Sequence, residues 1–495
     1  MSNFIGVDLG TTNSVMSYID ELGKPRILHN SEGSNITPSA VEIDNKNILV
    51  GIEAKKESRF KDNVLTEFKR YMGSEKEYEV NGKKFTPTDL SGFVLKKLIN
   101  DAKSKLGDVN EMIITTPANF TNEARAATIS AGKIAGSNVE HIINEPTAAA
   151  LFYVYDKKLQ SGKYAVYDFG GGTFDISLVE VIDQEIEVIS SLGVAKLGGK
   201  DLDTKLHELV LNKIKDLIPD YNYNPADFDA EELKITLSKR DSAMVRISQE
   251  NITISRNEFE TSISSLILQS EMCCESVMKE ASITPDELSG VLLVGGSTRI
   301  PSVKKSVEDI FKMEGITSVN PDEVVSLGAA IYAGMKSNSN LNPMQRNEIS
   351  KIGLLEVTNH YFGIIAVTLD EVRNAEILGN TVIINKNTQI PCEKTEPYTT
   401  VYEGQTEVSL KITQSTQLEK DPKFVKIIWE GLLDGLPEGR PSGQVIDVTY
   451  KYDDNERMFC EFLDVESGLK KSIDLSVKQG NNEVKNLSIE EFKVE

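Results

Sequence analysis

One glycine-rich turn flanked by carboxylates is the first place in this sequence where chemistry could occur. The stretch YAVYDFGGGTFDISLVEV carries, between its apolar ends, Asp168, Gly170, Gly171, Gly172, Thr173 and Asp175. Glycine loses more conformational entropy on folding than other residues do, so three in a row need a reason. A tight turn is one reason, and close approach of backbone N–H groups to phosphate oxygens is another. Carboxylates beside phosphate are accounted for if they hold a hydrated magnesium ion.

A second stretch near the N-terminus repeats this arrangement. FIGVDLGTTNS is a strand pattern followed by Asp8, Gly10, Thr11, Thr12 and Ser14. Two copies of strand, aspartate, glycine and hydroxyl residues predict a duplicated half, and two facing halves could hold a triphosphate from both sides. A third glycine turn, VGGSTR, fits either nucleotide contact or a simple strand-to-helix turn. The sequence has neither a P-loop motif nor a G-x-G-x-x-G motif opening a βαβ unit.

Composition limits the class of protein. The 495 residues include 54 Lys and Arg against 76 Asp and Glu, a formal net charge of -22. Such an acidic surface argues against general binding to nucleic acid or anionic membranes. There are four cysteines without a CxxC pair, which fits a reducing compartment and gives no support for zinc. The start of the chain shows no targeting segment, and no apolar run reaches membrane-spanning length. We expect a soluble cytoplasmic protein.

The elements that must position these residues change character along the chain. Strand and helix patterns alternate to about Ala333, which predicts α/β layers. The polar stretch 337–349 indicates a domain edge, and KIGLLEV follows it as a short apolar junction. After Thr358, period-two patterns such as TEVSLKIT and QVIDVTYKY predict an antiparallel β domain. About twenty polar residues remain after that domain.

Five motifs in order carry a resemblance: GVDLGTTNS, INEPTAAAL, YDFGGGTFDIS, LGGKDLD and VGGSTRIP. They resemble the DnaK-type heat-shock chaperone family, the heat shock protein 70 family. FKRYMGSEKEY and the short C-terminal end look most like its HscC-type members. The resemblance implies an α/β, actin-like ATPase of two ribonuclease-H-like lobes over 1–348, and an interdomain linker over 349–357. An all-β sandwich peptide-binding domain would cover 358–478, a short polar tail 479–495, and a C-terminal helical lid would be missing.

The resemblance also implies an ATP- or ADP-binding site with magnesium, and K⁺ as an optional companion ion. Asp8 and Asp168 would hold magnesium through water, Lys69 would stabilise the γ-phosphate, and Glu145 would contact the attacking water. Considered without the motifs, Lys69 is an ordinary exposed lysine, Glu145 a helix-start carboxylate, and Thr173 a β-branched strand residue. The catalytic set would be Lys69, Asp8, Glu145, Asp168 and Thr173. The nucleotide contacts would be Gly10, Thr11, Thr12, Asn13, Gly170, Gly171, Gly172, Gly198, Gly199, Glu231, Lys234, Ser238, Gly295, Gly296, Ser297, Arg299 and Asp322. Of these, Glu231, Lys234 and Ser238 fall on one helical face, which could equally be a solvated charged face.

In the β domain, the resemblance places a peptide pocket at Tyr398, Val401 and Val408, with core packing as the alternative for each. An extended peptide would be held by main-chain hydrogen bonds and this apolar pocket. The implied function is an ATP-dependent chaperone that binds short apolar segments of unfolded polypeptides. The implied partners are such segments, a J-domain co-chaperone and a nucleotide-exchange factor, with no nucleic acid, no membrane and a monomeric state.

Three departures from the family pattern bear on this function. A missing lid would let bound peptide dissociate faster. The family's linker starts with an acidic residue and continues as an apolar run, whereas here Lys351 leads and Gly353 interrupts it. The family's commonest members carry an arginine that meets the J-domain co-chaperone where this chain has His141. Coupling between the domains and the usual co-chaperone partnership are therefore both open.

Three other functions use the same core. An actin-like structural ATPase would polymerise and would not need the β domain. A sugar or acetate kinase would phosphorylate a small substrate and would lack the peptide-binding sandwich. A scaffold that binds nucleotide but has lost chaperone action is the third.

Overall fold

The computed structural model describes residues 4–109, 111–156, 159–222, 224–337, 340–370, 375–453, 457–475 and 492–495. These residues form two compact units. The first contains the described residues up to Leu354 together with 492–495, and the second contains those from Leu355 to Leu475.

The first sheet of the first unit contains the strand that carries Asp8. Its order is β11-β10-β1-β2-β3, with β4 also paired to β2. The β1–β2 and β2–β3 pairs are antiparallel, and the β1–β10 and β10–β11 pairs are parallel. The strands are β1 (Phe4–Leu9), β2 (Asn13–Ile19), β3 (Pro25–Ile27), β4 (Thr37–Pro38), β10 (Glu111–Thr116) and β11 (Ile142–Asn144).

The second sheet repeats this topology and carries Asp168. Its order is β18-β17-β12-β13-β14-β19, again an antiparallel meander whose first strand is continued by parallel neighbours. The strands are β12 (Gly162–Phe169), β13 (Phe174–Ile182), β14 (Glu185–Val194), β17 (Leu288–Val294), β18 (Gly315–Ile316) and β19 (Gly353–Leu355). The matched topologies confirm the predicted duplicated half.

Helices cover these sheets, and their ends follow local sequence signals. Thr86 and Ser255 form capping boxes at the starts of α2 and α7, and proline occupies the first turn of α2, α4 and α8. The larger helices of the unit are α2 (Pro87–Leu106), α3 (Asn122–Ile134), α4 (Glu145–Tyr155), α5 (Gly199–Leu217), α6 (Ala230–Lys239), α7 (Arg256–Ala281), α8 (Pro301–Phe311) and α9 (Val324–Lys336). A short hairpin, β15 (Ser242–Ile247) and β16 (Glu250–Ser255), follows α6. Two separate apolar cores form, one around each sheet.

Two helices cross with almost no side chain between them. A Cβ built on Gly328 of α9 would lie 1.7 Å from the carbonyl oxygen of Ala148 in α4. A Cβ on Gly6 of β1 would lie 2.2 Å from the backbone nitrogen of Ala330. Only glycine permits such backbone approach, so α9 packs directly on both α4 and β1.

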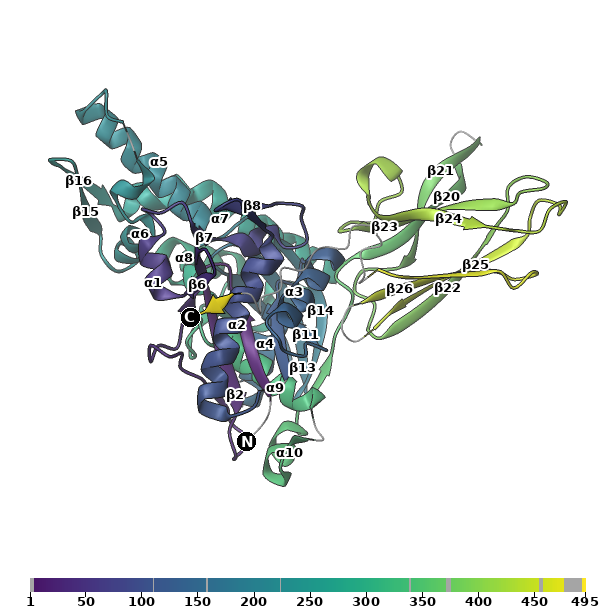
Figure 1. Ribbon diagram of the computed structural model, residues 1–495, viewed down its shortest axis with the longest axis horizontal. Coiled ribbons are helices and arrows are strands. Elements are labelled where there is room, and N and C mark those ends of the chain that lie inside the picture. The colour runs from purple at the N-terminus through teal and green to yellow at the C-terminus, as the bar shows by residue number, and fades with distance from the viewer. Residues whose placement is uncertain are drawn as a thin grey trace. The chain divides into compact units, whose positions relative to one another are not determined.

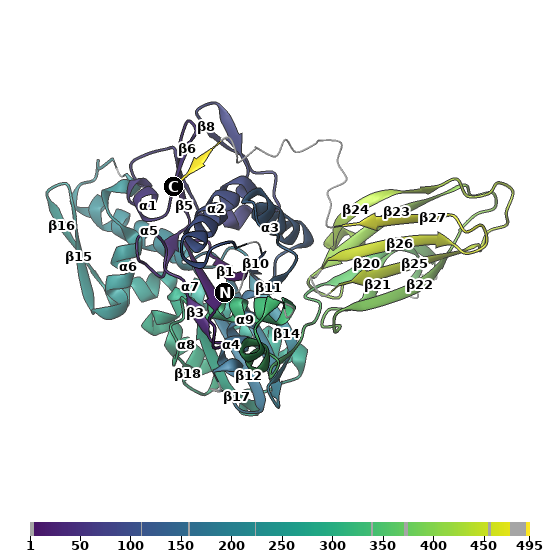
Figure 2. The same cartoon turned by 60° about the horizontal axis from the view of Figure 1, so that its bottom comes forward.

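A third, smaller sheet lies beside the first core. Its order is β28-β6-β5-β7, and both views place β28 beside β6 (Figure 1, Figure 2). The elements of this region are β5 (Ala40–Asp44), β6 (Asn47–Val50), α1 (Ile52–Glu57), β7 (Val64–Thr66), the 3-10 turn η1 (Phe68–Tyr71), the hairpin β8 (Tyr78–Val80) and β9 (Lys83–Phe85), and β28 (Lys493–Val494).

The predicted polar tail differs from the structure at its end. Phe492 is buried in the core of the first unit, and Lys493–Val494 form a strand. The four-residue alternation of apolar and charged residues is too short to signal a strand from sequence. Residues 476–491, which include 476–478 of the predicted β domain and 479–491 of the predicted tail, lie outside the described residues.

The junction between the units is also more structured than its polar sequence indicates. Residues Pro343–Ile349 form α10, because the Asn342 side chain accepts the backbone N–H groups of Met344 and Gln345 at 2.9 Å. β19 then forms the edge strand beside β14, and the Gly353 N–H donates to the Gln184 carbonyl at 3.2 Å. The predicted linker therefore begins at the end of a helix and contains a strand.

The second unit is an antiparallel β-sandwich (Figure 1). One sheet has the order β21-β20-β23-β24 and the other β22-β25-β26-β27, and their inward residues form one core. The strands are β20 (Tyr361–Asp370), β21 (Ala375–Ile384), β22 (Cys392–Thr399), β23 (Glu407–Ser415), β24 (Lys426–Asp434), β25 (Val445–Tyr452), β26 (Met458–Asp464) and β27 (Lys470–Asp474). The predicted β domain is confirmed, and the described residues after β27 contain no helix. Within the described chain, no helix is long and apolar enough to cross a membrane.

Candidate functional site

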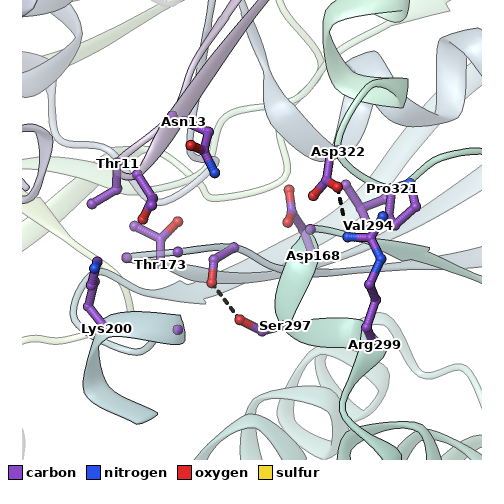
Figure 3. A pocket seen from close by; sticks show the side chains of 18 of the residues that line it. Thr11, Asn13, Asp168, Thr173, Lys200, Val294, Ser297, Arg299, Pro321 and Asp322 are labelled. Atoms are coloured by element: carbon purple, nitrogen blue, oxygen red, sulfur yellow. Dashed lines mark hydrogen bonds and ion pairs between the residues drawn. The ribbon is translucent and has the colours of Figure 1, made fainter. Parts of the chain in front are cut away.

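A cavity of about 740 Å³ opens between the two duplicated halves of the first unit. This volume suits a nucleotide-sized ligand. Figure 3 shows Thr11, Asn13 and Thr173 on one side of the cavity and Arg299 with Asp322 on the other. Every ATPase residue predicted from the sequence lines the cavity except Gly198, which caps α5 and packs against Gly172.

The two glycine turns interlock at the cavity wall. A Cβ built on Gly171 would lie 2.2 Å from the Thr12 hydroxyl oxygen, and one on Gly172 would lie 2.5 Å from the Thr11 hydroxyl oxygen. The turn after β12 therefore has room for the threonine side chains of the turn after β1 only because it lacks side chains itself. The buried Thr12 hydroxyl has no hydrogen-bond partner among the described residues. A phosphate oxygen at this position would supply the missing partner.

Three buried carboxyl groups converge behind these turns around one lysine. Asp8 ends β1 and accepts the Thr115 hydroxyl at 3.0 Å, and Asp168 ends β12. Glu145 begins α4, and its Oε1 lies 2.6 Å from Lys69 Nζ. Burial, followed by the charge of Glu145, raises the pKa of Asp8 to about 7 and the pKa of Asp168 well above its usual range. If all three were ionised, the ligand-free site would hold more negative charge than Lys69 alone can balance, so Asp8 and Asp168 keep their protons to a higher pH than usual.

Asp175 adds a fourth carboxyl group to this cluster and was absent from the predicted site. It lies opposite Asp168 in the β12–β13 pair and accepts the Asn119 N–H at 3.3 Å. Burial, followed by repulsion from Glu145, raises its pKa well above the usual range, and its other oxygen has no partner among the described atoms. Asp175 stands in the same glycine-rich stretch as Asp168, and this position could have indicated that it belongs to the site.

The donor set fits a cation held through water. Carboxylate oxygens are the ligands that Mg²⁺ prefers, and Mg²⁺ usually keeps several of its waters. Among the described residues, no group of three or more acidic, His or Cys side chains is close enough to hold a metal ion directly. A hydrated cation between Asp8 and Asp168 satisfies both observations and would lower the cost of burying these charges.

The far end of the cavity is formed by α6 and the turn after β17. Lys234 donates to the Gly199 carbonyl at 2.8 Å and pairs with Asp203 at 2.7 Å. Arg299 pairs with Asp322 at 2.7 Å, as Figure 3 shows. The solvated-face alternative for α6 does not apply to Lys234, which is buried.

Two lysines pair with Glu231, one of the residues that line the cavity. Lys55 of α1 lies 3.1 Å and Lys200 of α5 lies 3.3 Å from its carboxylate. Burial alone would raise the pKa of Glu231, but Lys200, Lys55 and Lys234 outweigh it and hold the pKa at about 2. Sequence reasoning missed Lys200, although it stands inside LGGKDLD immediately after two glycines.

Lys69 is buried, whereas the sequence considered without the family motifs predicts an ordinary exposed lysine. It is 4% exposed, because the left-handed Glu67 turns the chain into η1 and directs the lysine inward. Its ammonium lies 5.6 Å from the centre of the Phe120 ring as well as against Glu145. A buried lysine paired with a single carboxylate in a polar cavity is a candidate for chemistry.

The three predicted peptide-pocket residues are distributed differently. Tyr398 and Val408 are half-buried and pack against the β-sandwich core, whereas Val401 is 53% exposed on the loop between their strands. Burial raises the pKa of the Tyr398 hydroxyl to about 12. Core packing accounts for Tyr398 and Val408 in the ligand-free unit, and the exposed Val401 is the one of the three available to a partner.

Comparison with known proteins identifies the family. The chain matches the Hsp70 protein family over residues 4–80 and 74–493. It is 34% identical over 498 residues to the Chaperone protein DnaK of Mycoplasmoides gallisepticum, covering 95% of this chain and 80% of that protein. It is 37% identical over 472 residues to the Chaperone protein DnaK of Mycoplasmopsis agalactiae, covering 91% and 75%. The chain therefore belongs to the Hsp70 family, with the family's ATPase fold followed by its β-sandwich.

Proposed function

We propose that this protein is an ATP-dependent chaperone of the DnaK type, which hydrolyses ATP and uses the cycle to control its affinity for unfolded peptides. The observation that carries the proposal is the pair of interlocked glycine turns set in front of Asp8, Asp168, Glu145 and Lys69. Buried charge beside exposed backbone N–H groups suits phosphoryl transfer to water.

Each residue has a distinct role in this mechanism. Backbone N–H groups of Gly10 to Thr12 and of Gly171 and Gly172 donate to phosphate oxygens, and the Thr12 and Thr173 hydroxyls add further donors. Lys69 neutralises charge on the γ-phosphate, and Glu145 fixes the lysine and orients the attacking water. Asp8 and Asp168 hold the waters of a magnesium ion, which when bound shields the phosphate charge. K⁺ is proposed only as an optional companion ion. The adenosine lies between α6 and Arg299.

The β-sandwich supplies the peptide site in this proposal. Val401 and Tyr402 are both more than half exposed on the loop between β22 and β23, and isolated exposed apolar residues on a loop suit contact with an apolar peptide segment. Support for an HscC-type member comes from FKRYMGSEKEY, in which Lys69 lies. We further propose a cytoplasmic monomer, supported by four unpaired cysteines. A J-domain partner and an exchange factor stay predictions. His141 is the position to substitute in a test of J-domain binding, because the family's commonest members carry an arginine there.

Calorimetry tests nucleotide binding directly. We expect the purified chain to bind ADP and ATP in the presence of magnesium and to bind at least about tenfold more weakly with a chelator. Absence of magnesium-dependent binding would overturn the nucleotide site.

Substitution of Lys69 tests catalysis separately from binding. Lys69→Ala should retain nucleotide binding while turnover falls by about 1000-fold. Lys196→Ala, at an exposed lysine outside the cavity, is the matched control and should hydrolyse ATP normally. Normal turnover by Lys69→Ala would show that the catalytic assignment is wrong.

A panel of unfolded apolar peptides tests the chaperone cycle. We expect them to accelerate steady-state ATP hydrolysis several-fold, with a smaller effect in Val401→Asp. A protein that hydrolyses ATP but ignores every peptide in the panel would be an ATPase scaffold.

A further inference from the structure

A short segment at the end of the described chain completes the smallest sheet of the first unit. β28 pairs in parallel with β6, so that Lys493 is opposite Asn47 and Val494 is opposite Ile48. Three backbone hydrogen bonds of 2.9 Å join the segment to β6 and its flanks, from Lys493 N–H to the Lys46 carbonyl, from Glu495 N–H to the Ile48 carbonyl and from Val50 N–H to the Glu495 carbonyl. These contacts have the form of an extended peptide added to a sheet edge.

An aromatic side chain anchors the segment. Phe492 is 7% exposed, and its ring centre lies 5.5 Å from that of Phe93 and 6.1 Å from that of Phe85, both in edge-on arrangements. The Lys83 ammonium lies 4.9 Å from the centre of the same ring. Val494 packs on the same core, whereas Lys493 and Glu495 are exposed and pair with each other. The segment thus presents an apolar face inward and a charged face outward, as a strand of period two requires.

The position that the segment occupies would otherwise be an open edge. The sheet order β28-β6-β5-β7 leaves β6 without a second neighbour once β28 is removed. An unpaired strand edge exposes N–H and C=O groups that accept an added strand, and the neighbouring Phe85 and Phe93 would lose the ring that covers them. Backbone pairing plus one side-chain pocket are the two elements of a peptide-binding site.

This site connects directly to the nucleotide cavity. β6 ends at Val50 and α1 follows at once, carrying Lys55, which pairs with the cavity-lining Glu231. At the opposite edge of the same sheet, β7 leads into η1, which carries Lys69. Both cationic residues are therefore positioned by the sheet that the segment completes.

We propose that the edge of β6, with the pocket formed by Phe85 and Phe93, is a peptide-binding site of the nucleotide-binding unit, separate from the β-sandwich. Residues 492–495 are its resident ligand, bound within the same chain. The site takes an extended segment in which an aromatic residue is followed two positions later by a β-branched aliphatic residue. Its occupancy holds α1 and η1 in the positions that nucleotide requires. The peptide site itself stands whether or not the chaperone proposal holds.

Hydrogen exchange on the full chain tests the resident ligand. The Val50 amide donates to Glu495, so its exchange reports occupancy of the site. In Phe492→Ala we expect this amide to exchange at least about tenfold faster, since the anchor's burial is lost. The matched control is Phe424→Ala, which removes a 73% exposed ring from the second unit and should leave Val50 unchanged. Unchanged Val50 protection in Phe492→Ala would overturn the proposal.

Binding in trans separates a ligand site from a merely stabilising contact. A tethered ligand competes at high effective concentration, so a labelled peptide of residues 486–495 should bind the Phe492→Ala chain and bind the unmodified chain at least about tenfold more weakly. The same peptide with its phenylalanine replaced by alanine should also bind at least about tenfold more weakly. If Phe492→Ala is poorly folded by circular dichroism, Val494→Asp, which keeps the aromatic anchor, takes its place in both measurements. Failure of the peptide to bind a folded variant would overturn the ligand claim.

Nucleotide affinity tests the connection to the cavity. Magnesium-ADP should bind several-fold more weakly to Phe492→Ala than to Phe424→Ala, and saturating peptide should restore the affinity of Phe492→Ala and so remove the difference. Equal affinities would overturn the coupling, whereas loss of all nucleotide binding in the unmodified chain would instead contradict the proposed function.

Discussion

The two glycine turns of the cavity occupy equivalent places in the duplicated halves, yet the residues beside them differ. In the first half, Asp8 stands opposite Val15 in the β1–β2 pair. In the second half, Asp168 stands opposite Asp175 in the β12–β13 pair. The first wall therefore carries one carboxyl group at this level and the second wall carries two. The matched strand topologies give these side chains equivalent positions, but the number of carboxyl groups differs between the two walls.

The two glycine turns also differ in their side chains, and the two sets fit together. The turn after β1 contributes threonine side chains, and the turn after β12 contributes the empty space that receives them. This difference explains why the second copy needs glycine at positions 171 and 172, whereas a Cβ on Gly170 would meet no atom closer than 3.6 Å. The first wall supplies the Thr11 and Thr12 side chains, and the second wall supplies Gly171 and Gly172, which leave room for them, together with the Thr173 hydroxyl.

The largest expected effect tests whether the two walls act on one ion. Asp8→Asn and Asp168→Asn should each reduce kcat for ATP hydrolysis by at least about 100-fold, because both carboxylates hold waters of the same magnesium ion. The double variant should lose at most about tenfold more, since residues that act as a unit are not additive. Multiplication of the two losses in steady-state assays would show that the walls act independently.

The next effect concerns the pH dependence of stability in nucleotide-free, chelator-treated protein. The pKa of Asp8 rises from 3.8 unfolded to about 7 folded, chiefly through burial. The folded state thus retains a proton that the unfolded state releases, so stability falls as pH rises from about 4 to about 7 and is constant above. Asp8→Asn has no carboxyl group at this position and therefore lacks this loss. Its free energy of unfolding should exceed that of the unmodified chain by roughly 2–4 kcal/mol at pH 8 and by little at pH 4.

Urea unfolding at both pH values measures this difference. Asp44→Asn, at an exposed carboxylate of β5, is the control and should track the unmodified chain. An Asp8→Asn advantage that shrinks toward pH 8 would show that the carboxyl is charged and stabilising without a cation.

A smaller effect tests the interlock of the turns. Gly171→Ala places a methyl group against the Thr12 hydroxyl and should cost about 1–3 kcal/mol of unfolding free energy. Adding Thr12→Ala removes the opposing hydroxyl and should recover part of that cost. Strictly additive costs for Gly171→Ala and Thr12→Ala would contradict the interlock.

The smallest effect isolates the Thr12 hydroxyl. Because this buried oxygen has no partner among the described residues, Thr12→Val should change the stability of the nucleotide-free protein by less than about 1 kcal/mol. ADP affinity should fall by up to about tenfold, because a donor to phosphate is lost. A large stability loss with unchanged affinity would show that Thr12 has only a structural role.

Much of this architecture could be predicted from local sequence. The strands that end at Asp8 and Asp168 are short apolar runs punctuated by glycine, and their repetition predicted the duplication. Motif likeness placed Lys69 and Glu145, because no periodicity distinguishes a buried lysine from an exposed one. Asp175 was visible in the opening stretch but lacked a reason for inclusion until its burial was known.

Other features depend on contacts between residues far apart in the chain. Phe492 meets Phe85 and Phe93 across some 400 positions, and its four-residue pattern carries no detectable signal. α10 is the exception, because its start is a local capping box of Asn342 and Gln345 with Pro343 in the first turn, which the prediction from the polar run overlooked. Lys200 and Lys55 meet at Glu231 only because folding brings α5 and α1 to one place.

The direct crossing of α4 and α9 has a mechanical consequence. Each helix starts at the cavity, α4 with Glu145 and α9 just after Asp322. At Gly328 and Ala148 their backbones touch, so no side chain can change rotamer to absorb a displacement. A rotation of one helix at the crossing would therefore be transmitted to the other, and would shift Glu145, beside Lys69, relative to Asp322, which pairs with Arg299.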